Sequence, residues 1–276
     1  MSTKIIIDST VDLPAELRAR TTVVPLVVRF GEEEYQDGVT ISYQQFYEKL
    51  LVCKDLPSSS QPNPDTFAEV FQSVVDAGDE AVVLTISGRL SGTYQSACIA
   101  AEDFKGIYVV DSTVAAVAAG ILAQYALKLA DEGMDARSIA HKLDEEKGRV
   151  RLFAVLDTLE FLKRGGRLSA TAAMAGSLLN IKPVITLNDG IIEVAGKARG
   201  LRRGNAMMNE QVELSGGVDT DMPMLMGYTG LTDELLRAYL DGNDLWPADV
   251  AVSPLGSTIG THIGPGAYAV AYFCKK

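Results

Sequence analysis

Short apolar runs alternate along the chain with segments in which apolar residues recur every three or four positions. The runs at residues 4–8, 81–86 and 107–111 are rich in Val and Ile and predict buried strands. A further strand is expected at residues 23–28. Behind Asn63, a proline at the first helical position predicts the start of an amphipathic helix. This alternation favours an α/β fold with a mostly parallel sheet.

The pattern changes near Arg151. The turn Asn188-Asp189-Gly190 stands between two apolar runs, which predicts a β-hairpin and therefore antiparallel pairing. Ser169 is expected to cap a helix of small residues. Further predicted elements are strands at 152–156, 223–228, near Val250 and at 267–273, and helices over 201–214 and behind Thr232. We therefore predict two α/β domains, residues 1–150 with a mostly parallel sheet and residues 151–276 with a mixed sheet.

Composition narrows the range of partners. The chain has 276 residues, is 47% hydrophobic and carries a formal net charge of −11, with a pI near 4.7. This charge argues against nucleic acid and against an anionic membrane, because both repel an acidic protein. The three cysteines have no metal-like spacing and predict reduced thiols in the cytoplasm. No segment approaches the roughly 20 apolar residues that span a bilayer, so no stable membrane insertion is expected.

Basic residues are concentrated in one part of this acidic chain. Between Lys147 and Arg203, eleven Lys or Arg stand against four Asp or Glu. Such a region either steers an acidic partner protein or a phosphate-bearing ligand, or is a solvated helix face without a partner. The sequence leaves both readings open. The members near its C-terminal end are Lys197, Arg199, Arg202 and Arg203.

Three polar turns, rich in hydroxyls and glycine, adjoin apolar segments at residues 58–64, 87–94 and 261–266. A helix is expected to begin at Ser91 or Gly92, where its first N–H groups would be unpaired and its dipole end partly positive. If the three turns converge, they offer serine hydroxyls, backbone N–H groups and one imidazole to a small anion. A carboxylate is the simplest candidate.

The imidazole in these turns belongs to His262, which precedes a Gly-Pro-Gly sequence and a predicted strand. With an ordinary pKa it is partly charged near neutral pH and donates a hydrogen bond to a carboxylate. As a general base it would instead need Ser60 or Ser91 as its nucleophile. Asp8 or Asp111 would then orient it in an acyl-ester hydrolase. The sequence does not separate a donor, a base and a purely structural histidine.

Other catalytic and cofactor motifs are missing from the sequence. Neither a Gly-x-x-x-x-Gly-Lys-Ser/Thr phosphate loop nor a Gly-x-Gly-x-x-Gly turn at a strand end occurs, so nucleotide binding has no motif behind it. A Gly-x-Ser-x-Gly elbow is missing as well. With two histidines and no close cysteine pair, a zinc site has few possible ligands. We therefore predict neither a metal nor a cofactor.

Several short motifs occur in the order and spacing of one known family. They are Ile-Ile-Asp-Ser-Thr, Ser-Gln-Pro with a following Pro, Leu-Ser-Gly-Thr-Tyr-Gln-Ser-Ala, Val-Asp-Ser, Asp-Thr-Leu-Glu-Phe-Leu-Lys-Arg-Gly-Gly-Arg, Ile-Lys-Pro and His-x-Gly-Pro-Gly-Ala. Over essentially its whole length, the chain resembles the DegV family of bacterial fatty-acid-binding proteins. It departs from the family pattern at Ser59, where threonine is common, and at Gly88, where a second serine is common.

The resemblance implies two α/β domains, with a long-chain fatty acid in a buried tunnel and its carboxylate held between them. It also implies that the chain is not itself an enzyme: it presents the acid to a separate fatty-acid kinase subunit, which binds ATP and forms an acyl phosphate. The implied carboxylate ligands are Ser59 or Ser60, Ser91, Gly92 and His262, with Arg167 as a helper. The residues that resemble the kinase-docking segment are Lys197, Arg199, Arg202 and Arg203.

Overall fold

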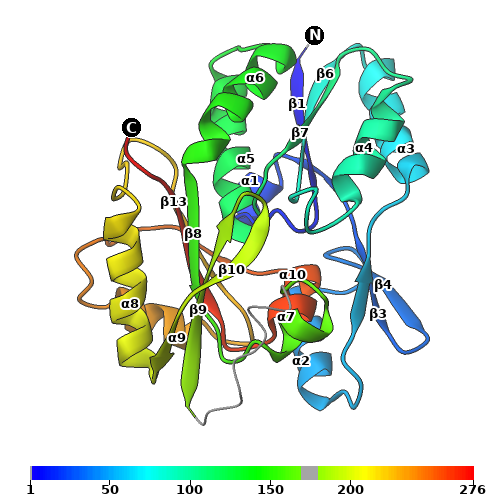
Figure 1. Ribbon diagram of the computed structural model, residues 1–276. Coiled ribbons are helices and arrows are strands. Elements are labelled where there is room, and N and C mark those ends of the chain that lie inside the picture. Colours follow the sequence, from blue (N-terminus) through cyan, green and yellow to red (C-terminus); the bar gives the residue numbers. More distant parts are fainter. Residues whose placement is uncertain (1, 169–179) are drawn as a thin grey trace.

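The computed structural model describes residues 2–168 and 180–276, and the strands in these ranges form three sheets (Figure 1). The first sheet is parallel, in the order β2-β1-β6-β7. Its strands are β1 (Thr3–Asp8), β2 (Thr22–Val24), β6 (Glu80–Thr85) and β7 (Ile107–Asp111). Apolar side chains fill both faces of β1 and β6, as expected for parallel strands that are covered on both sides.

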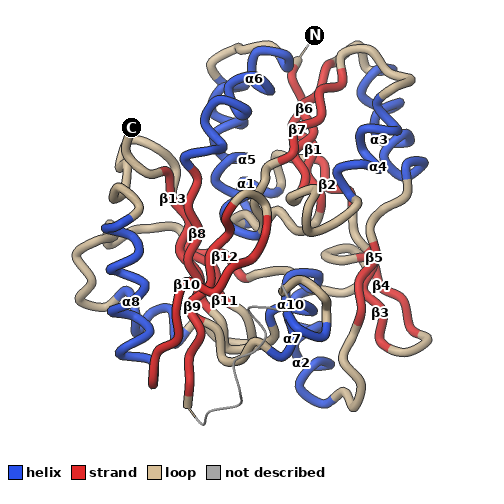
Figure 2. The backbone as a smooth tube through the Cα atoms, viewed as in Figure 1, coloured by secondary structure: helices blue, strands red, loops and turns tan. Residues whose placement is uncertain are grey.

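Helices cover both faces of this sheet (Figures 1 and 2). They are α3 (Pro64–Asp76) and α4 (Thr93–Ala101) on one face, and α5 (Ala116–Asp131) and α6 (Ala136–Glu146) on the other. The predicted start of α3 behind Asn63 is confirmed. Its Phe67, Phe71 and Val74 share one helical face and pack on the sheet. Helix α5 is buried almost all round because a second sheet lies on its other side.

The second sheet runs in the order β10-β9-β8-β13-β11-β12 and is antiparallel except between β11 and β12. Its strands are β8 (Val150–Val155), β9 (Ile181–Asn188), β10 (Ile191–Arg199), β11 (Leu225–Tyr228), β12 (Val252–Pro254) and β13 (Tyr268–Phe273). The predicted hairpin is present, with Asp189 and Gly190 at positive φ between β9 and β10. The outer face is covered by α8 (Leu201–Leu214), which has its predicted bounds, and α9 (Glu234–Leu240).

The third sheet is not predicted by the sequence pattern. Its strands, in the order β4-β3-β5, are β3 (Val27–Phe30), β4 (Glu33–Gln36) and β5 (Ser58–Ser60), with α2 (Tyr43–Val52) packed against them. The single strand expected at residues 23–28 is wrong: Pro25 cannot donate to a ladder, and the chain passes there from β2 into β3 of a different sheet. The turn expected at 58–64 starts as strand β5, with Ser59 opposite Val28.

The remaining helical elements are short. They are α1 (Ala15–Arg18), the 3-10 turn η1 (Lys147–Arg149), α7 (Glu160–Arg164) and α10 (Ser257–Ile263). The turn expected at 261–266 is wrong in its first half, because the chain is helical through Ile263. The helix α10 ends at Gly264, where φ is 73°. The helix expected behind Ser169 lies outside the described residues.

One hydrophobic cluster crosses residue 150. It joins Ile7 and Leu84 of the parallel sheet, through α5, to Ala154 and Ala269 of the mixed sheet. The strands up to β7 belong to the parallel and three-stranded sheets, and those from β8 onward belong to the mixed sheet. The chain therefore passes from one set of sheets to the other near residue 150, as expected, but a single hydrophobic core extends across that point. The division into domains 1–150 and 151–276 stays a prediction.

Candidate functional site

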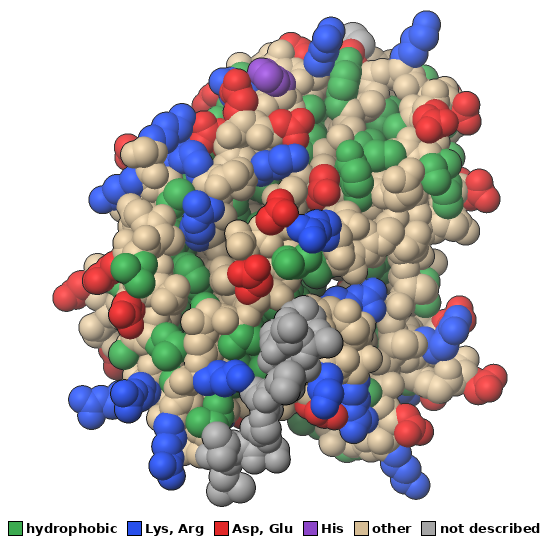
Figure 3. Space-filling model, viewed as in Figure 1, with side chains coloured by type: hydrophobic (Ala, Val, Ile, Leu, Met, Phe, Trp, Pro, Cys, Tyr) green, Lys and Arg blue, Asp and Glu red, His purple; other side chains and the backbone are tan. Residues whose placement is uncertain are grey.

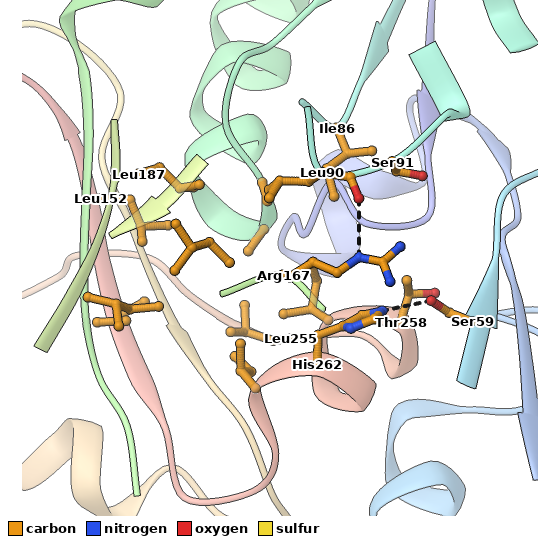
Figure 4. A pocket seen from close by; sticks show the side chains of 18 of the residues that line it. Ser59, Ile86, Leu90, Ser91, Leu152, Arg167, Leu187, Leu255, Thr258 and His262 are labelled. Atoms are coloured by element: carbon orange, nitrogen blue, oxygen red, sulfur yellow. Dashed lines mark hydrogen bonds between the residues drawn. The ribbon is translucent and has the colours of Figure 1, made fainter. Parts of the chain in front are cut away.

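A cavity lies where the parallel sheet, the mixed sheet and α10 meet (Figure 4). Its volume is about 80 Å³, several times what one water molecule needs. Most of its wall is apolar and comes from both halves of the chain, with Leu90 and Leu255 on loops and Ala154, Leu187 and Ala269 on strands. Such a wall offers water few hydrogen-bond partners, so the space suits an apolar guest.

Polar side chains gather at one end of the cavity (Figure 4). Ser59 comes from β5, Ser91 from the loop before α4, and Arg167 from the turn after α7. Thr258 and His262, four residues apart, lie on one face of α10. The three polar segments singled out in the sequence therefore converge. The cavity is polar at one end and apolar along the rest of its wall.

Ser59 and His262 form a hydrogen bond, with 2.8 Å between Oγ and Nε2. The other ring nitrogen, Nδ1, is buried and has no hydrogen-bond partner among the described residues. It lies against Gly165, where an added Cβ would overlap it. Because a proton on Nδ1 would be unsatisfied there, we assign the proton of the neutral ring to Nε2, which donates to Ser59. The hydroxyl proton of Ser59 is then free to bond another acceptor.

Burial and, after it, the positive charge of Arg167 lower the pKa of His262 from 6.5 to about 4. The partly charged imidazole expected from the sequence is therefore wrong, because the ring is neutral near pH 7. With its proton on Nε2, the ring does not take a proton from Ser59 as a general base would. The positive charge at this end of the cavity belongs to Arg167.

Arg167 is half-buried and held by two backbone carbonyls. Its Nη1 donates to the Gly165 carbonyl at 2.6 Å, and its Nε donates to the Leu90 carbonyl at 3.3 Å. Since Leu90 adjoins Ser91, the guanidinium links the turn after α7 to the loop that carries Ser91. No carboxylate of residues 2–168 or 180–276 pairs with Arg167. Its charge is therefore not neutralised within this part of the protein.

The other implied ligands differ in their placement. Ser91 lines the cavity, and its Oγ lies 2.8 Å from Oγ1 of Thr93. Gly92 is the N-cap of α4 and packs against Gln61, where an added Cβ would overlap the amide. Ser60 is exposed, because successive residues of a strand point to opposite faces. Of the alternatives Ser59 and Ser60, Ser59 lines the cavity; Ser60 and Gly92 are not part of its wall.

The two aspartates considered for a hydrolase triad accept hydrogen bonds from residues other than His262. Asp8 accepts hydrogen bonds from Thr10 and from the amide of Ile86. Asp111 accepts from the amides of Gly88 and Thr113. Both carboxylates brace local turns, and neither lines the cavity. Within the described residues, His262 therefore has no carboxylate to orient it, and the triad is not assembled.

Thr258 was not identified from the sequence. It is buried, lines the cavity and precedes His262 by one helical turn. The four-residue spacing of Thr258 and His262, which Ile259 and Ile263 repeat, would have indicated a helix in the sequence. The segment also contains glycine and β-branched residues, whose low helix propensity argued against a helix there.

The basic residues expected to meet a partner lie outside the cavity wall, at the end of β10 and the start of α8. Figure 3 shows Lys and Arg side chains gathered in this region, at the lower left of the view. The four are exposed and form no ion pair with any described residue: Lys197, Arg199, Arg202 and Arg203. Their role in docking stays a prediction.

The comparison with protein families agrees with the motifs. A family model described as "Uncharacterised protein, DegV family" matches residues 2–275. The chain belongs to the DegV family. A DegV domain-containing protein of Deinococcus radiodurans is 36% identical over 277 residues, an alignment that covers 98% of each chain.

Two solved structures of similar proteins share the fold. One is a DegV family protein from Thermus thermophilus, described by its fatty acid binding; it is 34% identical with a TM-score of 0.88, covering 99% of this chain and 100% of that one. The other is a stearic acid-binding protein from Eubacterium ventriosum; it is 28% identical with a TM-score of 0.81, covering 98% and 97% of the two chains. The predicted α/β class, with one parallel and one mixed sheet, is confirmed.

Residues 2–168 and 180–276 contain neither a membrane-spanning helix nor a metal-binding cluster. No helix there has both the length and the apolar character needed to cross a membrane. No group of three or more His, Cys, Asp or Glu side chains in these ranges is arranged to hold a metal ion.

The low pKa of His262 predicts how stability depends on pH. Unfolded protein regains a pKa near 6.5, so between pH 6.5 and 4 the unfolded state binds more protons than the folded state. The contribution of His262 to stability is fully present above pH 6.5 and falls as the pH is lowered through this window. Urea unfolding near pH 7 and pH 5 should show wild type losing about 2 kcal/mol more than His262→Gln. Equal losses would contradict the neutral, buried imidazole.

Proposed function

We propose that the chain binds a long-chain fatty acid in this cavity, with the acyl tail along the apolar wall and the carboxylate at the polar end. The observation that carries the proposal is the one-ended polarity of the cavity, which matches a molecule with a single acidic head. The fatty acid binding described for the similar proteins from Thermus thermophilus and Eubacterium ventriosum supports it. The carboxylate ligands in this proposal are Ser59, Ser91 and Arg167, and His262 acts through Ser59, to which it donates its Nε2 proton.

The two ends of the cavity contribute differently to binding. Each buried methylene contributes roughly 0.8 kcal/mol, so the tail supplies most of the affinity. At the head, Ser59 donates its hydroxyl proton to the carboxylate while its oxygen accepts from His262. Arg167 compensates the negative charge. Arg167 already donates two of its five N–H groups to backbone carbonyls, and we propose that the remaining ones bind one carboxylate oxygen and leave the other free to react.

We further propose that the chain is not itself an enzyme and presents this carboxylate, in the cytoplasm, to a separate kinase subunit. A carboxylate oxygen attacks the γ-phosphorus of ATP on that subunit, the bond to ADP breaks, and the acyl phosphate forms. The missing nucleotide motifs support a division of labour between two proteins. The exposed basic residues of β10 and α8 would meet an acidic surface of the partner.

Mass spectrometry of lipid that co-purifies with the protein tests the binding proposal. Release of free fatty acids of long chain length is expected. A protein that carries no lipid, and takes up none when offered stearate, would contradict the proposal.

The head-group assignment predicts that Ser91→Ala and His262→Ala reduce acyl-phosphate formation more than they reduce lipid retention, because the tail holds the ligand and the head sets its orientation. A loss of product of about tenfold or more is expected in a reconstituted kinase assay. Ser60→Ala is the matched control, since that hydroxyl lies on the other side of β5, and it should have no effect. Undiminished product from both site variants would contradict the assignment.

A further inference from the structure

The start of α10 is held by carboxylates from a distant part of the chain. The helix has Gly256 as its N-cap and no capping side chain of its own. Instead, the amides of Ser257 and Thr258 donate to the two oxygens of Asp37, at 2.9 and 3.0 Å. The Gly256 amide donates to Oδ1 of Asp12 at 2.8 Å. The first N–H groups of a helix need such partners, and a carboxylate also matches the positive end of its dipole.

Asp37 adjoins the small sheet that contacts the other end of α10. It follows β4, and its own amide donates to the carbonyl of Leu26 at 2.9 Å. β4 pairs with β3, and β3 pairs with β5, which carries Ser59. Ser59 in turn bonds His262 at the end of α10. The three-stranded sheet and the residue that follows it therefore contact α10 at both ends, Asp37 at its first turn and Ser59 at its last.

The two carboxylates are not equivalent. Asp37 uses both oxygens as acceptors, whereas Oδ2 of Asp12 is buried and has no partner among the described residues. Burial raises the pKa of Asp12 well above its ordinary value, and the hydrogen bond from the Gly256 amide opposes this rise only in part. An amide in place of Asp12 therefore preserves its one hydrogen bond. An amide in place of Asp37 turns one acceptor into a donor that faces one of the two helix N–H groups.

We propose that Asp37 is a positioning residue: by fixing the first turn of α10 on the three-stranded sheet, it sets where Thr258 and His262 stand at the polar end of the cavity. The relevance of this placement to a fatty acid rests on the proposed function. The placement itself does not, and it is measurable without lipid.

NMR of the two histidine side chains tests the proposal. His141 is exposed and serves as an internal reference. In wild type, His262 should stay neutral down to about pH 5, because its pKa is about 4. In Asp37→Asn, the first turn of α10 moves and water reaches the ring, so the midpoint of His262 should rise by about one pH unit or more. Asp12→Asn is the matched control and should leave the midpoint of His262 as in wild type.

A folded Asp37→Asn variant in which His262 titrates as in wild type would overturn the proposal, and so would an equal shift in Asp12→Asn. If Asp37→Asn does not fold, amide hydrogen exchange in wild type decides. Protection of the Ser257 and Thr258 amides comparable with the middle of α5 supports the Asp37 contact, and exchange as fast as in an exposed loop rejects it. Failure of wild type to bind stearate would contradict the proposed function and leave these outcomes unaffected.

Discussion

Ala154→Leu combined with Ala269→Leu is expected to weaken fatty-acid binding about a hundredfold while the protein stays folded. These alanines face each other across β8 and β13, and both line the cavity. Two leucines there would occupy the space that three or four methylenes of an acyl tail need. At about 0.8 kcal/mol for each displaced methylene, the loss is about 3 kcal/mol, or roughly two orders of magnitude in affinity. Displacement of a fluorescent fatty acid by stearate measures it.

Ala271→Leu provides the matched control for this experiment. Ala271 lies two residues along β13 on the same face, is fully buried, and is not part of the cavity wall. A leucine there overpacks the core and should lower the melting temperature without changing the affinity of the folded protein. The double variant fills an existing space and should melt near the wild-type temperature. Wild-type affinity in the double variant would place the acyl tail elsewhere.

The elements predicted correctly are those whose signal is local. The bounds of α8 follow from apolar spacing along one helix, and the hairpin follows from the turn residues between two apolar runs. The three-stranded sheet gave no such signal. β4 reads Glu-Glu-Tyr-Gln, with little apolar content, and β5 consists of three serines. Both are strands because β3 lies between them. β4 follows β3 directly as a hairpin but lacks an apolar alternation, and β5 pairs with β3 from a more distant part of the chain, which composition does not reveal.

In the candidate site, too, the details that depend on contacts between distant residues could not be predicted from the sequence. The sequence pointed to hydroxyls near residue 59 and to His262, yet it left Ser59 and Ser60 as alternatives. The register of β5 against β3 decides between them, because it turns Ser59 toward α10 and Ser60 toward solvent. The charge on the imidazole was misjudged for a related reason: its pKa depends on burial and on Arg167, which only folding brings close. Asp37 carried no local signal at all, since its partners lie 220 and 221 residues away.

Arg167→Ala is expected to reduce fatty-acid affinity near pH 7 by about ten- to a hundredfold, because it removes the positive charge at the polar end of the cavity. It should also raise the pKa of His262 above about 4, since Arg167 is one of the two causes of its lowering. That pKa should stay below 6.5, because burial is the larger cause and persists.

The stearate affinity of Arg167→Ala should depend on pH differently from that of wild type. As the pH falls from about 7 to 5.5, His262 of Arg167→Ala begins to take up a proton, and its charge partly replaces the lost guanidinium. The affinity of the variant for stearate, relative to wild type, should therefore recover as the pH falls. Arg167→Lys keeps a positive charge and should show no such recovery, although its point charge replaces the guanidinium fork poorly. An Arg167→Ala protein that binds as wild type does at both pH values would mean that the carboxylate lies away from Arg167.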